Sequence, residues 1–194
     1  MSSNDFDTVK KNWEKFEKYC KRLSDPHIDE LLDTLGERLV MCPASPRKDQ
    51  YGCYPGGLVE HAMEVTSLMR SLCDVYGTDI QLASIIKVGL LHEIGKVGDL
   101  TTPYFVDQDS DWHREKLGQL YKYSDDINKM SASHRTLFLL QHFGVILTQD
   151  EWLAIQLASG SHFEENRFYV GHEPSLAFIL QQSKQAVIHK ANMA

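Results

Sequence analysis

Hydrophobic residues recur at three- and four-residue spacing along most of the chain, which is the pattern of amphipathic helices. The first such run covers residues 4–24, and its apolar positions are Phe6, Val9, Trp13, Phe16, Cys20 and Leu23. Asp25-Pro26 then supplies an N-cap and a proline for the first helical position. The apolar face of the second run is Ile28, Leu31, Leu32, Leu35 and Leu39. The sequence therefore predicts two helices in the first 40 residues.

The helical pattern stops at residues 42–57, where prolines and glycines indicate a loop. A third helix is expected to begin at Leu58. Its wide apolar face is Leu58, Ala62, Val65, Leu68, Met69, Leu72, Cys73 and Tyr76. Asp79 is predicted to cap a fourth, strongly apolar helix that continues through Leu91. The third and fourth helices are expected to pack together in the centre of the molecule.

The second half of the chain is less regular at first and then helical again. Residues 95–130 are polar with scattered aromatics, which is typical of a rim or lid. A fifth helix is expected from Ser131 or Ser133 to Phe143. Thr148 and Glu151 form a capping box for a sixth helix. Pro174 is expected to start a last helix that ends near His189.

No strand-like alternation of useful length is visible, so the sequence predicts an all-α protein. We expect a single helical domain of about six to seven helices. Residues 1–40 are predicted to form an N-terminal helical extension packed on the core, and residues 41–194 the main helical domain.

Composition narrows the classes of function. The net charge of −7 argues against a general nucleic-acid binder, which would carry a basic stripe. No apolar run approaches the ~20 residues of a membrane span. Cys20, Cys42, Cys53 and Cys73 contain no Cys-x-x-Cys pair, and no signal peptide is visible. We therefore expect reduced thiols and a cytoplasmic protein. A zinc site from Cys42, Cys53 and His61 is a less favoured alternative.

The candidate chemistry lies at the end of the fourth predicted helix. His92 and Glu93 follow an apolar run directly, and buried polar groups are costly unless something satisfies them. A divalent cation would do so, and Lys96 follows in a glycine-rich turn. Because the third and fourth helices should pack together, His61 is expected to join His92 and Glu93 in one metal site. Imidazole and carboxylate ligands suit Mn, Co, Zn, Fe, Ni or Mg. The competing interpretation treats both histidines as satisfied core groups.

Two motifs at this position resemble a known family. Gly56-Gly57-Leu58-Val59-Glu60-His61, followed by Leu90-Leu91-His92-Glu93-Ile94-Gly95-Lys96, is similar to the HD-domain metal-dependent phosphohydrolases, and most closely to small bacteriophage members. Further similar segments are Pro43-Ala44-Ser45, Tyr121-Lys122-Tyr123-Ser124-Asp125, Ser133-His134-Arg135 and Leu147-Thr148-Gln149-Asp150-Glu151-Trp152. The resemblance covers residues 40–186. It implies an HD-type helical domain whose metal activates water for attack on a phosphate ester.

The resemblance also implies roles for individual residues. His61 and His92 match the first two metal ligands, and Glu93 stands where the family has Asp. Lys184 falls at the position of the family's late Asp ligand. A protonated lysine cannot bind a metal, but it could pair with Glu93 and take the place of the cation.

Other residues match the family pattern less closely. His134 matches a further metal ligand or phosphate contact, and His162 is a possible substitute for another histidine at the site. Lys96 and Arg135 are candidate phosphate partners. Glu64, which lies three residues after His61, is a candidate general base. For Lys96, Arg135 and Glu64 a solvated surface role is the alternative.

Three functions follow from these expectations. The first, which the sequence favours, is a hydrolase that acts on a nucleotide or a related phosphate ester. The second is a catalytically degenerate HD domain that binds a nucleotide or a protein. The third is a metal oxygenase on the same scaffold, which needs more ligands than can be placed. Metal content separates the first two, and a metal-free pocket with a Glu93–Lys184 ion pair supports the second. All three leave the oligomeric state open.

Overall fold

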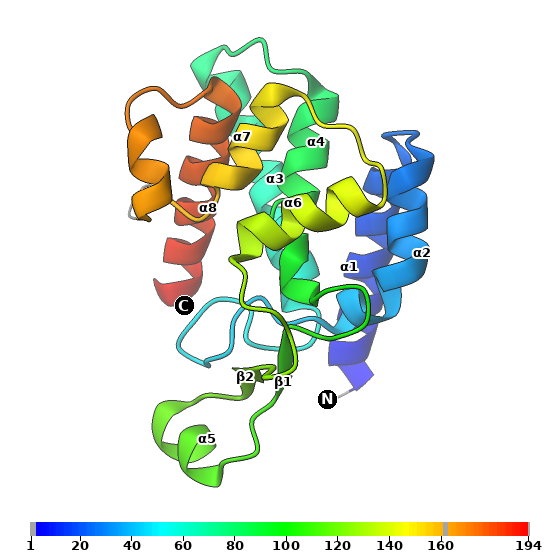
Figure 1. The fold of residues 1–194 in the computed structure, drawn as a ribbon, viewed down its shortest axis with the longest axis vertical. Coiled ribbons are helices and arrows are strands. Elements are labelled where there is room, and N and C mark those ends of the chain that lie inside the picture. Colours follow the sequence, from blue (N-terminus) through cyan, green and yellow to red (C-terminus); the bar gives the residue numbers. More distant parts are fainter. Residues whose placement is uncertain (1–2, 161–162, 194) are drawn as a thin grey trace.

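The structure, a computed structural model, is predominantly helical and confirms the all-α prediction (Figure 1). It describes residues 3–160 and 163–193. Within these ranges the elements are α1 (Ser3–Lys21), α2 (Pro26–Met41), α3 (Gly57–Tyr76), α4 (Leu82–Leu91), η1 (Ile94–Val97), β1 (Phe105–Asp107), α5 (Asp111–Leu117), β2 (Tyr121–Tyr123), α6 (Ala132–His142), α7 (Gln149–Leu157), η2 (Glu164–Tyr169) and α8 (Ser175–Met193). The two η segments are short 3-10 helices.

The helices α3 and α4 form the centre of the molecule. In Figure 1 they lie between α1 and α2 on one side and α7 and α8 on the other. The helix α3 packs on α1, α2, α4 and α8, so it contacts most of the fold. Phe16 of α1 and Leu35 of α2 belong to the same buried cluster as Leu91 of α4 and Leu180 of α8. The helices α1 and α2 thus contribute to the same hydrophobic core as the other helices. The division of the chain into an extension, residues 1–40, and a main domain, residues 41–194, stays a prediction.

Three of the predicted helix starts are confirmed by their caps. The Asp25 carboxylate accepts a hydrogen bond from His27 N at the start of α2. The Ser131 hydroxyl accepts from His134 N at the start of α6, and Thr148 and Glu151 form the capping box of α7. The prediction for Asp79 was wrong. Gly77 ends α3 with a left-handed φ of 61°, and the chain continues as a loop until Gln81 caps α4.

An arm extends from the helical body within residues 95–130, the segment predicted to be a rim or lid (Figure 1). The strands β1 and β2 pair antiparallel, with Phe105 opposite Tyr123, and α5 lies between them in sequence. No residue of α5 is buried. We expected no strand here, because three-residue strands are too short to show an alternating pattern.

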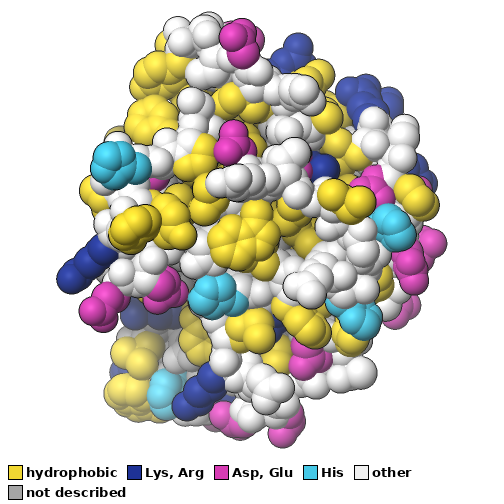
Figure 2. Space-filling view, turned by 45° about the horizontal axis from the view of Figure 1, so that its top comes forward, with side chains coloured by type: hydrophobic (Ala, Val, Ile, Leu, Met, Phe, Trp, Pro, Cys, Tyr) yellow, Lys and Arg dark blue, Asp and Glu magenta, His cyan; other side chains and the backbone are white. Residues whose placement is uncertain are grey.

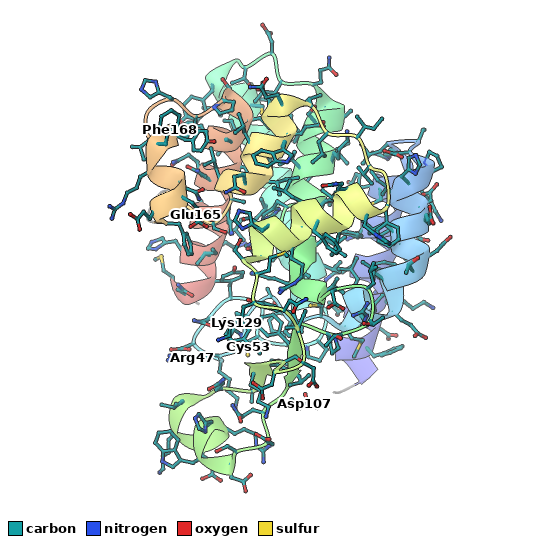
Figure 3. All side chains as sticks on the ribbon, viewed as in Figure 1. Arg47, Cys53, Asp107, Lys129, Glu165 and Phe168 are labelled. Atoms are coloured by element: carbon teal, nitrogen blue, oxygen red, sulfur yellow. The ribbon has the colours of Figure 1, made fainter. Side chains whose placement is uncertain are left out.

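The loop at residues 42–56 joins the base of this arm to the core. Leu120 N donates a hydrogen bond to Pro46 O at 2.9 Å, and Lys48 N donates to Gly118 O at 2.8 Å. Figure 3 labels Arg47 and Cys53 of this loop, and Asp107 of β1, at the base of the arm. The loop therefore contacts both the arm and the start of α3.

The surface is mixed in character. Figure 2 shows hydrophobic side chains spread among histidines and charged groups on one face. All four cysteines are free and buried, as expected for reduced thiols. Among the described residues, no helix combines the length and the apolar character that crossing a bilayer requires.

Candidate functional site

The first histidine of the site is placed by a tight glycine contact at the start of α3. Gly56 caps the helix with a left-handed φ of 85°. A Cβ atom on Gly57 would lie 2.1 Å from Gly52 O, so only glycine fits there. This close approach fixes the loop against the first turn of α3, and the buried His61 follows directly after that turn. The Tyr51 ring of the same loop lies 4.4 Å from the His61 ring, measured between centroids.

The second histidine, His92, follows directly after the last residue of α4 and is also buried. Its Nδ1 lies 2.9 Å from Gly89 O. Because a carbonyl oxygen can only accept, Nδ1 carries the proton and Nε2 presents a lone pair. The Nε2 atoms of both His61 and His92 are buried without a hydrogen-bond partner among the described residues. The centroids of the two rings are 6.1 Å apart. One potential metal-ligand atom from each of His61, His92 and Glu93 lies within 4.8 Å of the other two.

The Glu93 carboxylate is held by two lysines. Lys96 Nζ lies 2.8 Å from Oε2, and Lys184 Nζ lies 2.7 Å from Oε1. The predicted pairing of Glu93 with Lys184 is therefore present in the structure. Lys96 also donates to Ala44 O and to the Tyr51 hydroxyl, each at 2.8 Å, and Lys184 donates to Ala158 O at 2.9 Å. Each ammonium group is thus fixed by backbone as well as by Glu93.

The electrostatics of the cluster follow from burial and from these lysines. Burial alone would raise the Glu93 pKa, but Lys184 and then Lys96 hold it well below its usual value. Burial lowers the pKa of His61 to about 3 and that of His92 to about 4, against the opposing pull of Glu93. Both imidazoles are therefore neutral at pH 7. One carboxylate and two ammonium groups leave the cluster with a formal charge of +1.

The residues of the cluster fit a divalent cation only in part. The two unpartnered Nε2 atoms are suitable ligands. The only carboxylate, however, already has an ammonium group on each oxygen. A unit charge about 4 Å from another is worth roughly 4 kcal/mol near a protein surface, so a divalent ion beside two lysines meets strong repulsion. As it is paired here, Glu93 does not fit the role of a metal ligand.

A cavity of about 370 Å³ lies against Lys96 and Tyr51. The rings of Tyr104, Phe105 and Tyr123 line its other side, with centroids 4.9–5.6 Å apart. The buried Arg135 guanidinium lies 4.6 Å from the centroid of the Tyr104 ring, and its Nη1 has no hydrogen-bond partner among the described residues. Of the two predicted phosphate partners, Lys96 lines this aromatic cavity, whereas Arg135 contacts one of its lining rings, Tyr104.

Other predicted site residues lie outside the cluster. Glu64 is exposed and pairs with Lys190 at 3.2 Å, and the metal-capable cluster of the described residues does not include it. His134 is exposed in the first turn of α6, and the metal-capable cluster of the described residues does not include it. His162 lies outside the described residues. Whether Glu64 and His134 have a catalytic or ligand role stays a prediction that this placement does not support.

Sequence reasoning missed two contributors. Tyr51 lies in the proline- and glycine-rich loop, where only its position before the Gly56-Gly57 turn could have indicated a role. Its hydroxyl lies 3.4 Å from Glu93 Oε1 in addition to its contact with Lys96. Thr136 of α6 donates to His92 O at 3.2 Å and accepts from Gly95 N at 2.9 Å. Thr136 thereby fixes the turn that carries His92 and Glu93.

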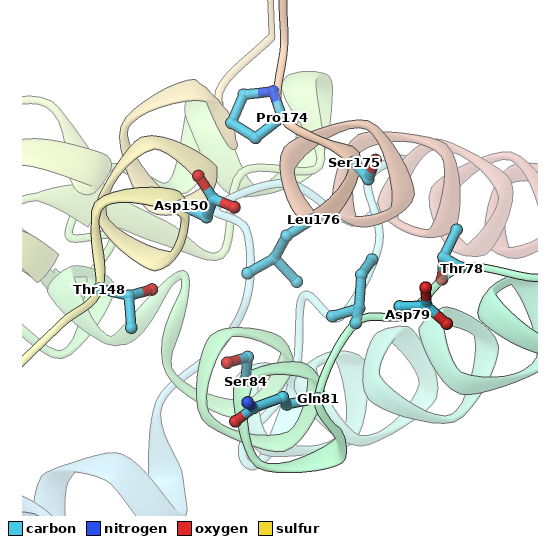
Figure 4. A pocket seen from close by; sticks show the side chains of 10 residues that line it. Thr78, Asp79, Gln81, Ser84, Thr148, Asp150, Pro174, Ser175 and Leu176 are labelled. Carbon is cyan, nitrogen blue, oxygen red and sulfur yellow. The ribbon is translucent and has the colours of Figure 1, made fainter.

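A larger cavity, of about 430 Å³, lies away from the cluster (Figure 4). It is bordered by the loop before α4 and by the first residues of α7 and α8. Figure 4 shows Asp79 and Asp150 at its edge, and the described residues that line it include no basic side chain. It therefore lacks the charge and the imidazoles of the site around Glu93.

Comparisons of the whole chain with models of protein families, with curated proteins and with solved structures found no match.

Proposed function

We propose that this chain is an HD-like binding module that has replaced the metal of the phosphohydrolases with lysines, and that it binds a small phosphate-bearing ligand without hydrolysing it. The observation that carries the proposal is the pairing of Glu93 with both Lys96 and Lys184. Two ammonium groups supply the positive charge that a divalent ion would supply. The position that the family resemblance assigns to the late Asp ligand is occupied by one of them.

Electrostatics support a ligand that is an anion. The cluster has a residual charge of +1 although the whole chain has −7. Positive charge at a partly buried position focuses its field into the adjoining cavity. Lys96 borders that cavity directly, and the Arg135 guanidinium lies against Tyr104, one of its lining rings. Negative groups such as phosphates are favoured there over neutral molecules.

The shape and lining of the cavity support a ligand with a flat group. Its volume of about 370 Å³ is in the range of small-molecule sites. Tyr104, Phe105 and Tyr123 offer aromatic faces on which a planar ring can stack. A nucleotide combines such a ring with phosphates and is the ligand class we propose.

A metal-dependent hydrolase is the second candidate, and the free Nε2 atoms of His61 and His92 favour it. A divalent cation held by these atoms would supply a Lewis acid and a more acidic bound water. For this function Lys184 must leave Glu93 before the cation binds. The two candidates therefore differ in whether the Glu93–Lys184 pair persists in the working protein.

Calorimetric titration of nucleoside mono-, di- and triphosphates and of inorganic phosphate, in EDTA, tests the proposal. We expect metal-independent binding of at least one nucleotide, no hydrolysis, and only trace metal in protein purified without chelators. Lys96→Met should abolish this binding. Lys129→Met, a change at an exposed lysine outside the site, should leave it intact.

A second variant tests the role of Lys184. Lys184→Asp restores the carboxylate that the family resemblance implies, so we expect this variant to acquire a transition metal that the native chain does not retain. Stoichiometric metal in the native chain that is lost in His92→Ala, together with metal-dependent release of phosphate, would overturn the binding proposal and establish the hydrolase.

A further inference from the structure

A third cavity, of about 310 Å³, lies between α1, α3 and α4. Apolar side chains form part of its wall, and they include Met63 of α3 and Ile85 and Ile86 of α4. None of its lining residues belongs to the cluster around Glu93. Leu82, which also lines the cavity, is exposed although it is a large apolar residue. The wall thus offers apolar surface that the fold itself does not cover.

Three cations surround this cavity. Lys15 and Arg22 reach it from α1 and its C-terminal end, and Arg70 reaches it from α3. No carboxylate of a described residue lies within 4.0 Å of their charged groups, since all the ion pairs of the described residues involve other cations. The Arg22 guanidinium lies 4.9 Å from the centroid of the Tyr19 ring, which also lines the cavity. This cation–π contact favours a position of the Arg22 guanidinium beside the cavity.

Such an arrangement is unusual for a chain with seven excess negative charges. Like charges around one cavity repel one another, and no ion pair with a described residue offsets this repulsion here. A ligand with a negative head group and an apolar body would neutralise the cations and cover the apolar wall at once. A cationic or a purely polar ligand would satisfy only one of these surfaces or neither.

We propose that this cavity is a binding site for a small single-chain amphiphilic anion, of the chemical class of a medium-chain carboxylate. The head group lies among Lys15, Arg22 and Arg70, and the alkyl chain lies against Met63, Ile85 and Ile86. The volume is at the lower end of the range for small-molecule sites, which favours a single short chain over a two-chain lipid or a folded partner. This site is independent of the proposed function around Glu93.

The test is a titration of the full chain with hexanoate, octanoate and decanoate below their micelle concentrations, followed by amide chemical shifts. Each added methylene that becomes buried should tighten binding about fourfold until the cavity is full. Shift changes should concentrate at the lining residues Thr66, Ser67 and Ile85, and not around Lys96. Decyltrimethylammonium, with an alkyl chain of similar length and the opposite charge, should bind much more weakly than decanoate.

Charge-removing variants complete the test. The double variant Arg22→Gln/Arg70→Gln should weaken decanoate binding about tenfold, because each exposed charge contributes modestly. These residues are exposed, so the fold should survive. Lys129→Gln is the matched control and should change nothing. Equal binding of the carboxylate and the ammonium compound, affinity that does not depend on chain length, or an equal loss in the control would each overturn the proposal.

Discussion

The Lys184 ammonium group lies 2.7 Å from Glu93 Oε1, so a side chain of the last helix neutralises a carboxylate at the end of α4. Lys96 holds the other oxygen at 2.8 Å from the turn that follows. Two charges in a site that is almost closed to water are costly unless their partners are fixed. Here Ala158 O and Ala44 O fix the two lysines. The cluster is therefore a single electrostatic unit whose members depend on one another.

Each single variant of the Glu93–Lys184 pair should lower the free energy of unfolding, and the two losses should not add up in the double variant. Glu93→Gln leaves two ammonium groups beside a neutral amide and should destabilise by about 3–5 kcal/mol. Lys184→Met leaves Glu93 with Lys96 and should cost about 1–3 kcal/mol for that reason. The double variant should cost clearly less than the sum of the two. Urea denaturation followed by circular dichroism measures all three.

Lys190→Met is the control for this cycle. Its ammonium group pairs with Glu64 at 3.2 Å on the surface, and such pairs contribute about 0–1 kcal/mol. We expect little change in the free energy of unfolding. Strict additivity of the Glu93 and Lys184 variants would show that the two side chains are not coupled in solution.

Stability should fall when the protein is acidified from pH 7 toward pH 4. The pKa of His61 is lowered to about 3 and that of His92 to about 4, whereas histidines of the unfolded chain titrate near 6.5. Below about pH 6.5 the unfolded state therefore binds protons that the native state does not, and the free energy of unfolding decreases. Glu93 acts in the same direction at lower pH, because its native pKa lies below that of the unfolded chain.

Denaturation curves at a series of pH values test this dependence. In His92→Gln the slope of stability against pH between 7 and 5 should become shallower, because one of the two titrating groups is gone. His113→Gln, a change on the arm, is the matched control and should keep the native slope. A stability that stays constant between pH 7 and 5 in the native chain would contradict the burial of neutral imidazoles.

Much of the helical scaffold could be predicted because it is encoded locally. Apolar spacing located the helices, and the caps at Asp25, Ser131 and Thr148 were visible as short motifs. The arm could not be predicted in this way. Its strands β1 and β2 pair with each other across α5, and Leu120 N donates a hydrogen bond to Pro46 O of a distant loop. Contacts between residues far apart in the chain leave no local sequence pattern.

The site was predictable where two helices had to pack. His61, His92 and Glu93 come from elements that share an apolar interface, so their convergence followed from the hydrophobic pattern. The failure at Asp79 had a different cause. Asp79 has the chemistry of a cap, but the loop after Gly77 continues, and the cap position falls two residues later, at Gln81. Tyr51 lies in a loop whose path depends on tertiary contacts, so its contacts with Lys96 and Glu93 could not be predicted from the sequence.

The contact between Gly57 and Gly52 should be essential for the position of His61. In Gly57→Ala the new methyl group meets backbone, not a flexible side chain, so the loop or the start of α3 must shift. We expect destabilisation on the order of 2–4 kcal/mol, the range of severe steric changes in a packed interior. Thermal and urea unfolding measure the loss.

Gly77→Ala is the matched control for Gly57→Ala. Its φ of 61° is strained for alanine, but nothing lies within 4 Å of the added Cβ atom. The cost should stay near 1 kcal/mol. If both variants cost the same, the close approach to Gly52 does not constrain the loop, and the position of His61 depends on the rest of α3.

Arg135 should matter for ligand binding more than its place in an early helical turn suggests. Its side chain is buried, Nη2 donates to Asn128 O at 2.7 Å, and the guanidinium covers the Tyr104 ring. Arg135→Lys keeps the charge but loses the planar stacking and the fixed geometry of the donors. If the aromatic face is part of the binding site, nucleotide affinity in EDTA should fall about tenfold in the Lys variant, a change of about 1.4 kcal/mol.

Arg167→Lys, at an exposed position of η2, should bind as the native chain does. Full binding by Arg135→Lys together with loss in Arg135→Gln would instead assign Arg135 a purely electrostatic role and remove Tyr104 from the proposed binding surface.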